Sequence, residues 1–378
     1  MTAKSTVAYT LRGGAVSSPS STSSCVMACR LVYSNASESS TVPWGEYHRD
    51  VRRVLLVTLL VVAACAILAW AEMIRMPGAS YSGALPPLSD AEKRIAGGLS
   101  RDVHYLAGEL GERNTDHFPA LASAADYVER ELAAAGYTPK RQPVDAPGKK
   151  CDNIEVRAPG ASRPDEIIVV GAHYDSAPGS PGADDNASGV AAMLALARAL
   201  HGRGHARTLA FVGFVNEEPP HFQQESMGSL VYARRSRARG ENIVAMLSLE
   251  SLGYYDDSPR SQQYPAVARP FYPRTGNFVG FVGNVGSRAL VRRALGAFRT
   301  RARFPSEGAA MPELVEGVGC SDQWSFRRSD YQGIMVTDTA PFRYPHYHTP
   351  RDTPEKVDYE RLARVVTGLE GVLVDLAE

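Results

Sequence analysis

Short apolar runs alternate with helical stretches through the C-terminal part of this chain, and this alternation restricts the fold more than any other feature. The runs predicted as strands are Glu166–Ala172, Thr208–Val215, Asn242–Leu249, Asn277–Gly283 and Gly333–Thr337. The stretches predicted as helices are Leu121–Ala135, Ser188–Leu200, Ser287–Phe298 and Tyr359–Leu376. Such alternation is typical of a mostly parallel or mixed sheet covered by helices, so we expect an α/β fold. Ligands bind beyond the carboxyl ends of such strands, and polar residues that directly follow them are therefore candidate site residues.

An uncharged apolar segment, Val54–Ala71, precedes this region. At 1.5 Å per residue, a helix of this length spans roughly 27 Å, which is enough to cross a bilayer. The basic residues Arg49, Arg52 and Arg53 lie just before it, and a basic flank tends to stay in the cytoplasm. The sequence therefore predicts a single-pass membrane protein whose C-terminal domain lies on the periplasmic or extracytoplasmic side.

Two alternatives to a retained anchor remain open. Ala69-Trp70-Ala71 resembles a signal-peptide cleavage site, and Val62-Ala63-Ala64-Cys65 resembles a lipidation site. For the rest of the chain we expect four segments. They are a disordered extension rich in serine and threonine at residues 1–50, the signal anchor at 51–75, a linker interrupted by proline and glycine at 76–87, and one large domain at 88–378.

Charge and cysteine content exclude several classes of protein. Lysine plus arginine equals aspartate plus glutamate at 41 each, so there is no basic field to attract nucleic acid. Of the five cysteines, Cys151 and Cys320 alone lie beyond the apolar segment, and no CxxC pair occurs. A cysteine zinc site and a dense disulfide framework are therefore not expected, while a single Cys151–Cys320 bridge stays open. No feature of the sequence indicates an oligomeric state.

Potential metal ligands follow three of the predicted strands and occur again in two loops. They are, in chain order, His173, Asp175, Asp184, Asp185, Glu217, Glu218, Glu250 and His348. Imidazoles and carboxylates suit a pair of zinc ions, and five ligands can hold both ions if one carboxylate bridges them. Two close ions can share a hydroxide that acts as nucleophile, and a further carboxylate must then accept the proton of the water.

In order and spacing, these residues resemble the bacterial leucyl aminopeptidase type of dizinc exopeptidase, whose relatives include glutamate carboxypeptidase II, the glutaminyl cyclases and the transferrin receptor. The resemblance covers roughly residues 100–375. The motifs that carry it are Gly111-Glu112-Arg113-Asn114, His173-x-Asp175, Gly182-x-Asp184-Asp185-Asn186-x-Ser188-Gly189, Glu217-Glu218, Glu250, Ser321-Asp322 and Tyr347-His348-Thr349. It implies a mixed, mostly parallel central sheet flanked by helices, and two Zn²⁺ ions per chain in a peptidase domain at residues 88–378.

The resemblance also implies a role for each site residue. Asp185 corresponds to the bridging ligand, because the family's bridge directly precedes the asparagine, and Asp184 is then only its neighbour. His173 and Glu250 would complete one zinc site, and Glu218 and His348 the other. Glu217 would be the general base and Tyr347 would stabilise the oxyanion. Asp175 is expected to accept the second imidazole N–H of His173 and so orient the ring.

The sequence departs from the best-known members of this family in two places. Glu250 stands where many have aspartate, so side-chain specificity does not transfer. The stretch after Glu218 is longer than usual and is expected to form an active-site loop, in which His221 is a candidate substrate contact.

The function that the resemblance implies is release of N-terminal residues from peptides by a metal-dependent aminopeptidase, with Glu217 as general base. Three alternatives remain. They are a carboxypeptidase or dipeptidase of the same fold, a glutaminyl cyclase that uses one zinc ion, and a receptor-like member without activity.

Overall fold

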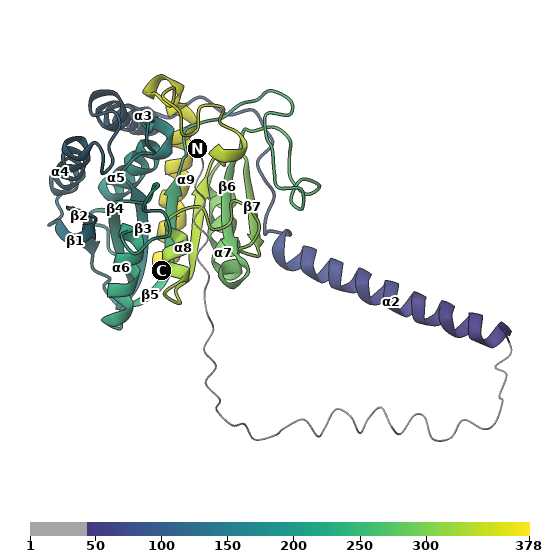
Figure 1. Ribbon diagram of the computed structural model, residues 1–378. Coiled ribbons are helices and arrows are strands. Elements are labelled where there is room, and N and C mark those ends of the chain that lie inside the picture. Colours follow the sequence, from purple (N-terminus) through teal and green to yellow (C-terminus); the bar gives the residue numbers. More distant parts are fainter. Residues whose placement is uncertain (1–43) are drawn as a thin grey trace, which may run out of the picture. The chain divides into compact units, whose positions relative to one another are not determined.

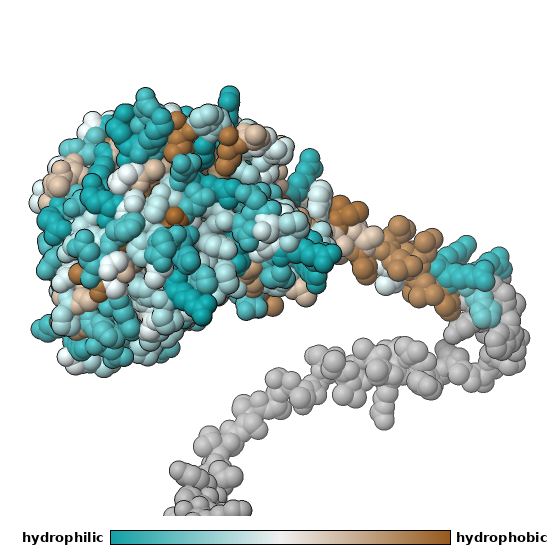
Figure 2. Space-filling model, turned by 90° about the horizontal axis from the view of Figure 1, so that it is seen from above, coloured by the Kyte–Doolittle hydropathy of each residue, from teal (hydrophilic) through white to brown (hydrophobic). Residues whose placement is uncertain are grey.

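The computed structural model describes residues 44–378, so most of the segment expected to be disordered lies outside the described residues. The chain has two units, Met1–Cys65 and Ala66–Glu378, and helix α2 (Trp44–Met73) passes from the first into the second. Within α2, Val51–Met73 is long and apolar enough to cross a membrane. Figure 2 shows hydrophobic residues over most of this helix, whereas the visible face of the second unit is largely hydrophilic. A helix without a polar face is suited to hydrocarbon rather than to water.

The second unit is built on one eight-stranded mixed sheet (Figure 1) with the order β1-β2-β4-β3-β5-β8-β6-β7. The strands are β1 (Lys140–Ala146), β2 (Lys149–Ala158), β3 (Arg163–His173), β4 (Arg207–Phe214), β5 (Asn242–Glu250), β6 (Val279–Asn284), β7 (Ser306–Met311) and β8 (Gly333–Thr337). The four central strands β4, β3, β5 and β8 are parallel. β1, β2 and β6 join their neighbours in antiparallel pairs, and β7 is parallel to β6. The α/β prediction is confirmed.

Helices cover both faces of this sheet. The α-helices are α3 (Asp90–Val103), α4 (Phe118–Ala134), α5 (Gly189–Leu200), α6 (Gly228–Ala238), α7 (Arg288–Arg301), α8 (Gln323–Arg327) and α9 (Tyr359–Ala377). The shorter helical turns are η1 (His104–Glu109), η2 (Ala183–Ser188), η3 (Val285–Ser287), η4 (Ala340–Phe342) and η5 (Pro354–Lys356). Side chains alternate along a strand, so Ile168 and Val170 of β3 pack with α3, α4, α5, α7 and α9, whereas Ile167 and Val169 pack with α6 and α8. The chain thus forms three layers.

The segment between α2 and α3 has no regular structure, but it is held against the sheet. Arg299 Nη1 of α7 donates to the carbonyls of Pro77 and Gly78, at 3.0 and 3.2 Å. The backbone N–H of Ser306 on the edge strand β7 donates to Ser80 Oγ at 2.9 Å. α3 then begins with a capping box, in which Ser89 Oγ accepts from the backbone N–H of Glu92.

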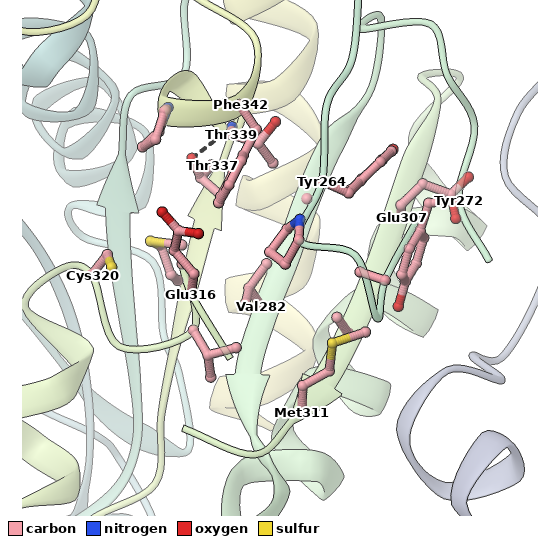
Figure 3. Close-up of a pocket in the computed structure, with 18 of the residues that line it drawn as sticks. Tyr264, Tyr272, Val282, Glu307, Met311, Glu316, Cys320, Thr337, Thr339 and Phe342 are labelled. Carbon is pink, nitrogen blue, oxygen red and sulfur yellow. Dashed lines mark hydrogen bonds between the residues drawn. The ribbon is translucent and has the colours of Figure 1, made fainter. Parts of the chain in front are cut away.

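A cavity of about 100 Å³ opens beside the end of β5 (Figure 3). Its walls come from β6, β7 and β8 and from the loops around residues 262–272 and 315–320. Most of its lining is apolar, and Glu250 and Tyr347 form part of it. Cys320 also lies on its wall and Cys151 is buried in β2; both are free thiols, so the bridge that the sequence left open is absent.

Candidate metal centre

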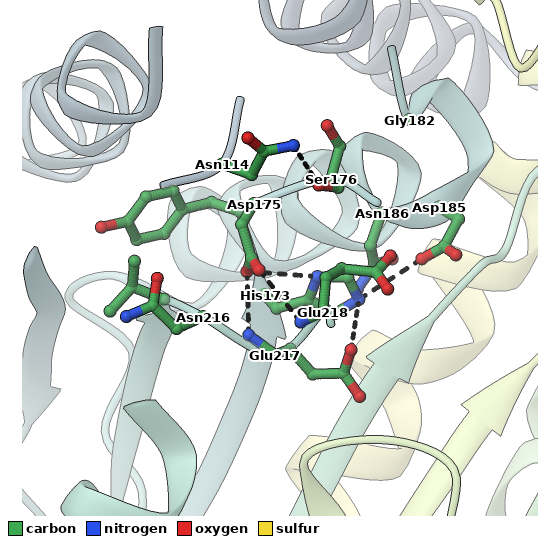
Figure 4. Close-up of polar contacts among 12 residues, drawn as sticks. Asn114, His173, Asp175, Ser176, Gly182, Asp185, Asn186, Asn216, Glu217 and Glu218 are labelled. Carbon is green, nitrogen blue, oxygen red and sulfur yellow. Dashed lines mark hydrogen bonds and ion pairs between the residues drawn. The ribbon is translucent and has the colours of Figure 1, made fainter. Parts of the chain in front are cut away.

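Three neighbouring strands bring candidate ligands to one edge of the sheet. β3 ends at His173, β5 ends at Glu250, and Glu217 and Glu218 follow β4 after Val215 and Asn216. Because β4, β3 and β5 are adjacent and parallel, their carboxyl ends lie together. Figure 4 shows His173, Glu217 and Glu218 converging beyond the strand ends.

Asp185 lies between the two candidate histidines. Its Oδ1 is 3.4 Å from His173 Nε2, and its Oδ2 is 3.0 Å from His348 Nε2. Glu250 Oε2 lies 3.2 Å from His173 Nε2, and Glu218 Oε1 lies 3.4 Å from His348 Nε2. The five residues therefore form two groups of three that share Asp185, with the donor atoms of each group within 4.8 Å of one another.

These residues fit a pair of zinc ions. Asp185 Oδ1 and Glu218 Oε1 are buried oxygens without a hydrogen-bond partner among the described residues. Buried polar atoms are nearly always paired, so these two oxygens suit a cation. Two imidazoles and three carboxylates are a ligand set that zinc accepts, and the shared Asp185 can serve both ions.

Glu217 borders this centre. With His173 and Glu218 it forms a third group of donor atoms within 4.8 Å, so distance alone does not exclude it as a ligand. Its Oε2 lies 3.9 Å from His173 Nε2, however, which is farther than the oxygens of Asp185 or Glu250. Glu217 is thus positioned beside the two groups rather than at the middle of either.

Asp175 supports three of these residues at once. Its Oδ1 lies 3.5 Å from His173 Nδ1, on the side of the ring where the orienting contact was predicted, but this nitrogen has no hydrogen-bond partner among the described residues. The same oxygen accepts the backbone N–H of Glu217 at 3.2 Å, and Oδ2 accepts the backbone N–H of Glu218 at 3.0 Å. The two backbone contacts were not expected from the sequence, and they couple the orientation of His173 to the position of the glutamate pair.

The centre carries an excess of buried negative charge. Burial raises the pKa of Glu218 to about 7, and the Asp185 carboxylate contributes in the same direction. Burial, with Glu218 and Glu250 nearby, also raises the pKa of Glu217 well above its usual range. Burial opposes protonation of His348, but Asp185 and Glu218 outweigh it and raise its pKa to about 10. Clustered carboxylates that raise each other's pKa in this way attract cations.

The turn that carries Asp185 is held by a residue far along the chain. Asp352 accepts the backbone N–H of Asp184 at 2.9 Å through Oδ1 and that of Asp185 at 3.1 Å through Oδ2. Gly182 begins the turn in the left-handed region at φ 62°, and a Cβ there would lie 2.3 Å from the Asp185 carbonyl. Only glycine therefore fits. The side chain of Asp184, predicted to be a neighbour of the bridging ligand, accepts from the backbone N–H of Gly253 at 2.7 Å.

Asn186 joins the same turn to the end of β5. Its Nδ2 donates to the Leu249 carbonyl at 2.8 Å, and its Oδ1 accepts from the backbone N–H of Ser251 at 3.0 Å. These two partners flank Glu250 in the sequence, so Asn186 holds Asp185 and Glu250 in one frame.

Arg113 supports the loop before this turn from inside the protein. The guanidinium is fully buried, and its partners among the described residues are all backbone carbonyls, which belong to Tyr174, Leu106, Gly111, Pro181 and Gly182. Burial lowers its pKa to about 10. The family resemblance contained Arg113, but no local pattern indicated this role.

The loop before α9 brings His348 to the centre. The ring of His346 instead packs against Tyr344, with 5.5 Å between the ring centroids. Tyr347 stacks on His348 at 3.9 Å and lines the cavity beside Glu250, and burial raises the pKa of its phenol. His348 was the residue predicted from the resemblance.

The contacts of His221 do not support the prediction that this side chain binds substrate. Its Nε2 lies 3.1 Å from Thr115 Oγ1 and its Nδ1 lies 2.8 Å from Ser226 Oγ. The side chain is buried, and burial lowers its pKa. Both ring nitrogens are thus engaged by the protein, and this histidine stabilises its own loop.

Comparison with known proteins identifies a peptidase family and similar sequences. The model of Peptidase family M28 matches residues 153–371. The chain is 35% identical over 280 residues to the uncharacterized protein YfbL of Escherichia coli, covering 72% of this chain and 85% of YfbL. It is 28% identical over 338 residues to a probable zinc metalloprotease of Pyricularia oryzae, covering 77% of this chain but only 65% of that protein.

Among solved structures, the zinc aminopeptidase BSAP of Bacillus subtilis has a similar fold. The TM-score is 0.58 at 15% sequence identity, and the match covers 75% of this chain and 95% of BSAP. At this identity the likeness is one of fold.

Proposed function

The chain belongs to peptidase family M28, and we propose from this premise that it is a zinc-dependent aminopeptidase that releases N-terminal residues from peptides. The observation that carries the proposal is the pair of donor groups that share Asp185. A receptor-like protein would have no need of two complete donor groups beside a cavity, with four of their five residues buried.

We assign His173, Asp185 and Glu250 to one zinc ion and Asp185, Glu218 and His348 to the other. When bound, two zinc ions would polarise the peptide carbonyl and lower the pKa of a water molecule. Asp175 would keep His173 in the tautomer whose Nε2 faces the metal, because its carboxylate faces Nδ1.

Glu217 is assigned as the proton acceptor and donor. Its backbone is held by Asp175, and its carboxyl lies at the margin of both donor groups. Such a group can take the proton of the attacking water and return it to the leaving amine. Tyr347 is assigned to donate a hydrogen bond to the developing oxyanion, since its phenol is protonated at neutral pH and it lines the cavity together with Glu250.

The cavity favours an aminopeptidase over a carboxypeptidase. The charged residues that line it are Glu250, Glu307 and Glu316, and it has no lysine, arginine or histidine among its described lining residues. A carboxypeptidase must bind the terminal carboxylate of its substrate, usually with arginine or another cation. An acidic and apolar pocket instead suits a residue with a free amino group.

We further propose that α2 is a signal anchor that keeps this domain on the extracytoplasmic side. A reporter that is active only in the periplasm, fused after Glu378, should be active, while a cytoplasm-dependent reporter should be silent. The support is the basic residues before Val54 and the length of the apolar span. The reverse pattern would exclude this topology.

A substrate comparison with metal analysis tests the function. The full chain in detergent should cleave peptides with a free N-terminus and leave the same peptides untouched when they are N-acetylated, whether or not the C-terminus is amidated. Chelation should abolish the rate, zinc should restore it, and two zinc ions should bind per chain. Cleavage of the acetylated peptides alone would contradict the proposal, and a stoichiometry of one zinc would favour the cyclase alternative.

A further inference from the structure

Exposed apolar side chains gather around the carboxyl ends of β6 and β7. Among the described residues beyond α2, the large apolar side chains that are exposed are Val267, Phe271, Val285 and Leu314. Val285 directly follows β6 and Leu314 lies three residues after β7, and these two strands are adjacent and parallel. None of the four side chains lines the cavity or belongs to the donor groups of the metal centre. The catalytic assignment therefore gives them no role.

The loop that carries Val267 and Phe271 is attached to β7. Tyr272, the residue after Phe271, donates from its hydroxyl to the carbonyl of Gly308 in β7 at 2.9 Å. A small apolar cluster joins this loop to the end of β7 and to the loop that follows it, and it consists of Ala268, Met311 and Val318 (the β7 cluster). Tyr272 and Val315 pack against this cluster. The exposed side chains of both loops are thus sequence neighbours of residues that meet at the β7 cluster.

Two of the exposed side chains lie at the tips of hydrogen-bonded turns. The backbone N–H of Ala268 donates to the carbonyl of Pro265 at 2.9 Å, so Val267 lies in the middle of that turn. A second turn, closed by the backbone N–H of Val315, holds Leu314 in the same place, and Leu314 is 90% exposed. Turn tips in water usually carry polar residues or glycine. Apolar side chains at both tips indicate that this side of the domain meets an apolar surface.

α2 ends beside this side of the domain, and its last residues, from Ala66 onward, belong to the same unit. Glu72 in its last turn pairs with Arg288, which lies three residues after Val285. Ile74, the first residue beyond α2, packs against the β7 cluster. If α2 spans a bilayer, Ile74 lies about 3.8 Å beyond the last helical residue, in a headgroup region that is roughly 5–8 Å thick. The β7 cluster is then at the level of the headgroups.

A basic side chain accompanies the apolar ones. Arg269 is exposed between Val267 and Phe271 and has no ion-pair partner among the residues that the structure describes. Apolar side chains next to arginine or lysine are typical of surfaces that lie in the interface of a bilayer with anionic lipids. Single side chains on turn tips also suit lipid, which adapts its shape to them, whereas a protein partner would need a complementary surface.

We propose that these four exposed side chains dock on the outer surface of the bilayer that α2 spans, with Arg269 at the lipid phosphates. The inference rests on the proposed signal anchor. Docking would fix the orientation of the domain relative to the membrane, because the end of one helix supplies only a single point of attachment. The cavity, whose lining includes the members of the β7 cluster, would then lie close to the lipid surface.

Photocrosslinking in vesicles tests the docking. In the full chain, Phe271, Leu314 or Lys140 is replaced by the photoreactive amino acid p-benzoylphenylalanine, and each protein is reconstituted into vesicles of phosphatidylcholine and phosphatidylglycerol. Lys140 is the matched control, since it is exposed on β1, the edge strand at the opposite end of the sheet from β7. After irradiation, we expect lipid adducts at positions 271 and 314 and none at position 140, measured by mass spectrometry of the digested chain.

The outcomes separate the alternatives. A lack of lipid adducts at positions 271 and 314, or equal labelling at position 140, would overturn the proposal. A crosslink between two chains at either position would assign the surface to a second copy instead, which also overturns it. If alkaline carbonate extracts the wild type from the vesicles, the anchor itself fails and the docking with it, and that result is read without any variant. The thermal midpoint verifies that the three substituted proteins are folded.

Discussion

Asp175 offers a direct test of how Glu217 and Glu218 are positioned, because its carboxylate accepts the backbone N–H groups of both residues. The Asp175→Asn substitution keeps the size of the side chain, but one of the two carboxylate oxygens becomes an amide NH₂ group. That group then faces the backbone N–H of Glu217 or Glu218, which is also a donor. One charge-assisted hydrogen bond is then lost, and a hydrogen bond to a charged group contributes about 1.5–3 kcal/mol. If that energy is lost from the arrangement of Glu217 and Glu218, kcat/KM falls by about 10- to 150-fold. The loss should appear as weaker zinc binding together with a lower kcat at saturating zinc.

The assay is a zinc titration of activity, with metal content measured on the same samples. Asp126→Asn serves as control, because Asp126 is an exposed carboxylate that pairs with Arg141 far from the centre. A variant at position 175 with wild-type kcat and zinc affinity would refute the reasoning. It would mean that the two backbone contacts do not position Glu217 or Glu218.

Three further predictions follow from individual contacts. Glu217→Gln should retain both zinc ions and lose about 10²-fold or more in kcat, whereas Glu218→Gln should lose zinc and recover in part when zinc is added; equal metal content with full activity in both would contradict the assignment. Arg113→Lys should lower the free energy of unfolding by about 3–5 kcal/mol in denaturant titrations, because a lysine cannot reach the same five carbonyls; a change below 1 kcal/mol would show that water replaces them. Burial raises the pKa of Asp338 to about 7. The folded chain thus holds a proton that the unfolded chain has lost above about pH 4, so the stability of the metal-free protein should decline from pH 4 to 7. Asp338→Asn should remove on the order of 4 kcal/mol of that decline, measured by unfolding at each pH, and an unchanged pH profile would contradict the shift.

The central strands were predictable because they are buried on both faces and therefore read as continuous apolar runs. β3, β4, β5 and β8 each overlap a predicted strand. β1 and β2 were missed because polar residues occupy their solvent side and Pro143 lies within β1. Proline is tolerated there since β1 is an edge strand, where one side of the backbone has no partner. Local composition cannot distinguish such a strand from a loop.

The candidate ligands could also be predicted from the sequence, because they follow predicted strands or lie in the motifs that resemble the family. The residues that hold these ligands could not. Asp352 supports Asp184 and Asp185 from 168 and 167 positions away, and Arg113 reaches Gly182 from 69 positions away. Nothing local at Asp352 or Arg113 indicates which backbone group it will meet, since that depends on how the whole chain folds.

Three side chains hold the segments that carry Asp185, Glu217, Glu218 and Glu250. Asp175 holds Glu217 and Glu218, Asp352 holds Asp185, and Asn186 links the turn of Asp185 to the end of β5. These hydrogen bonds fix the backbone that carries the donor atoms, so we expect binding of zinc to require little rearrangement of that backbone. A preorganised set of ligands binds more tightly than a flexible one because less conformational entropy is lost. It follows that zinc affinity depends on these holding residues as well as on the ligands, and that changes in them can weaken the centre while every ligand remains in place.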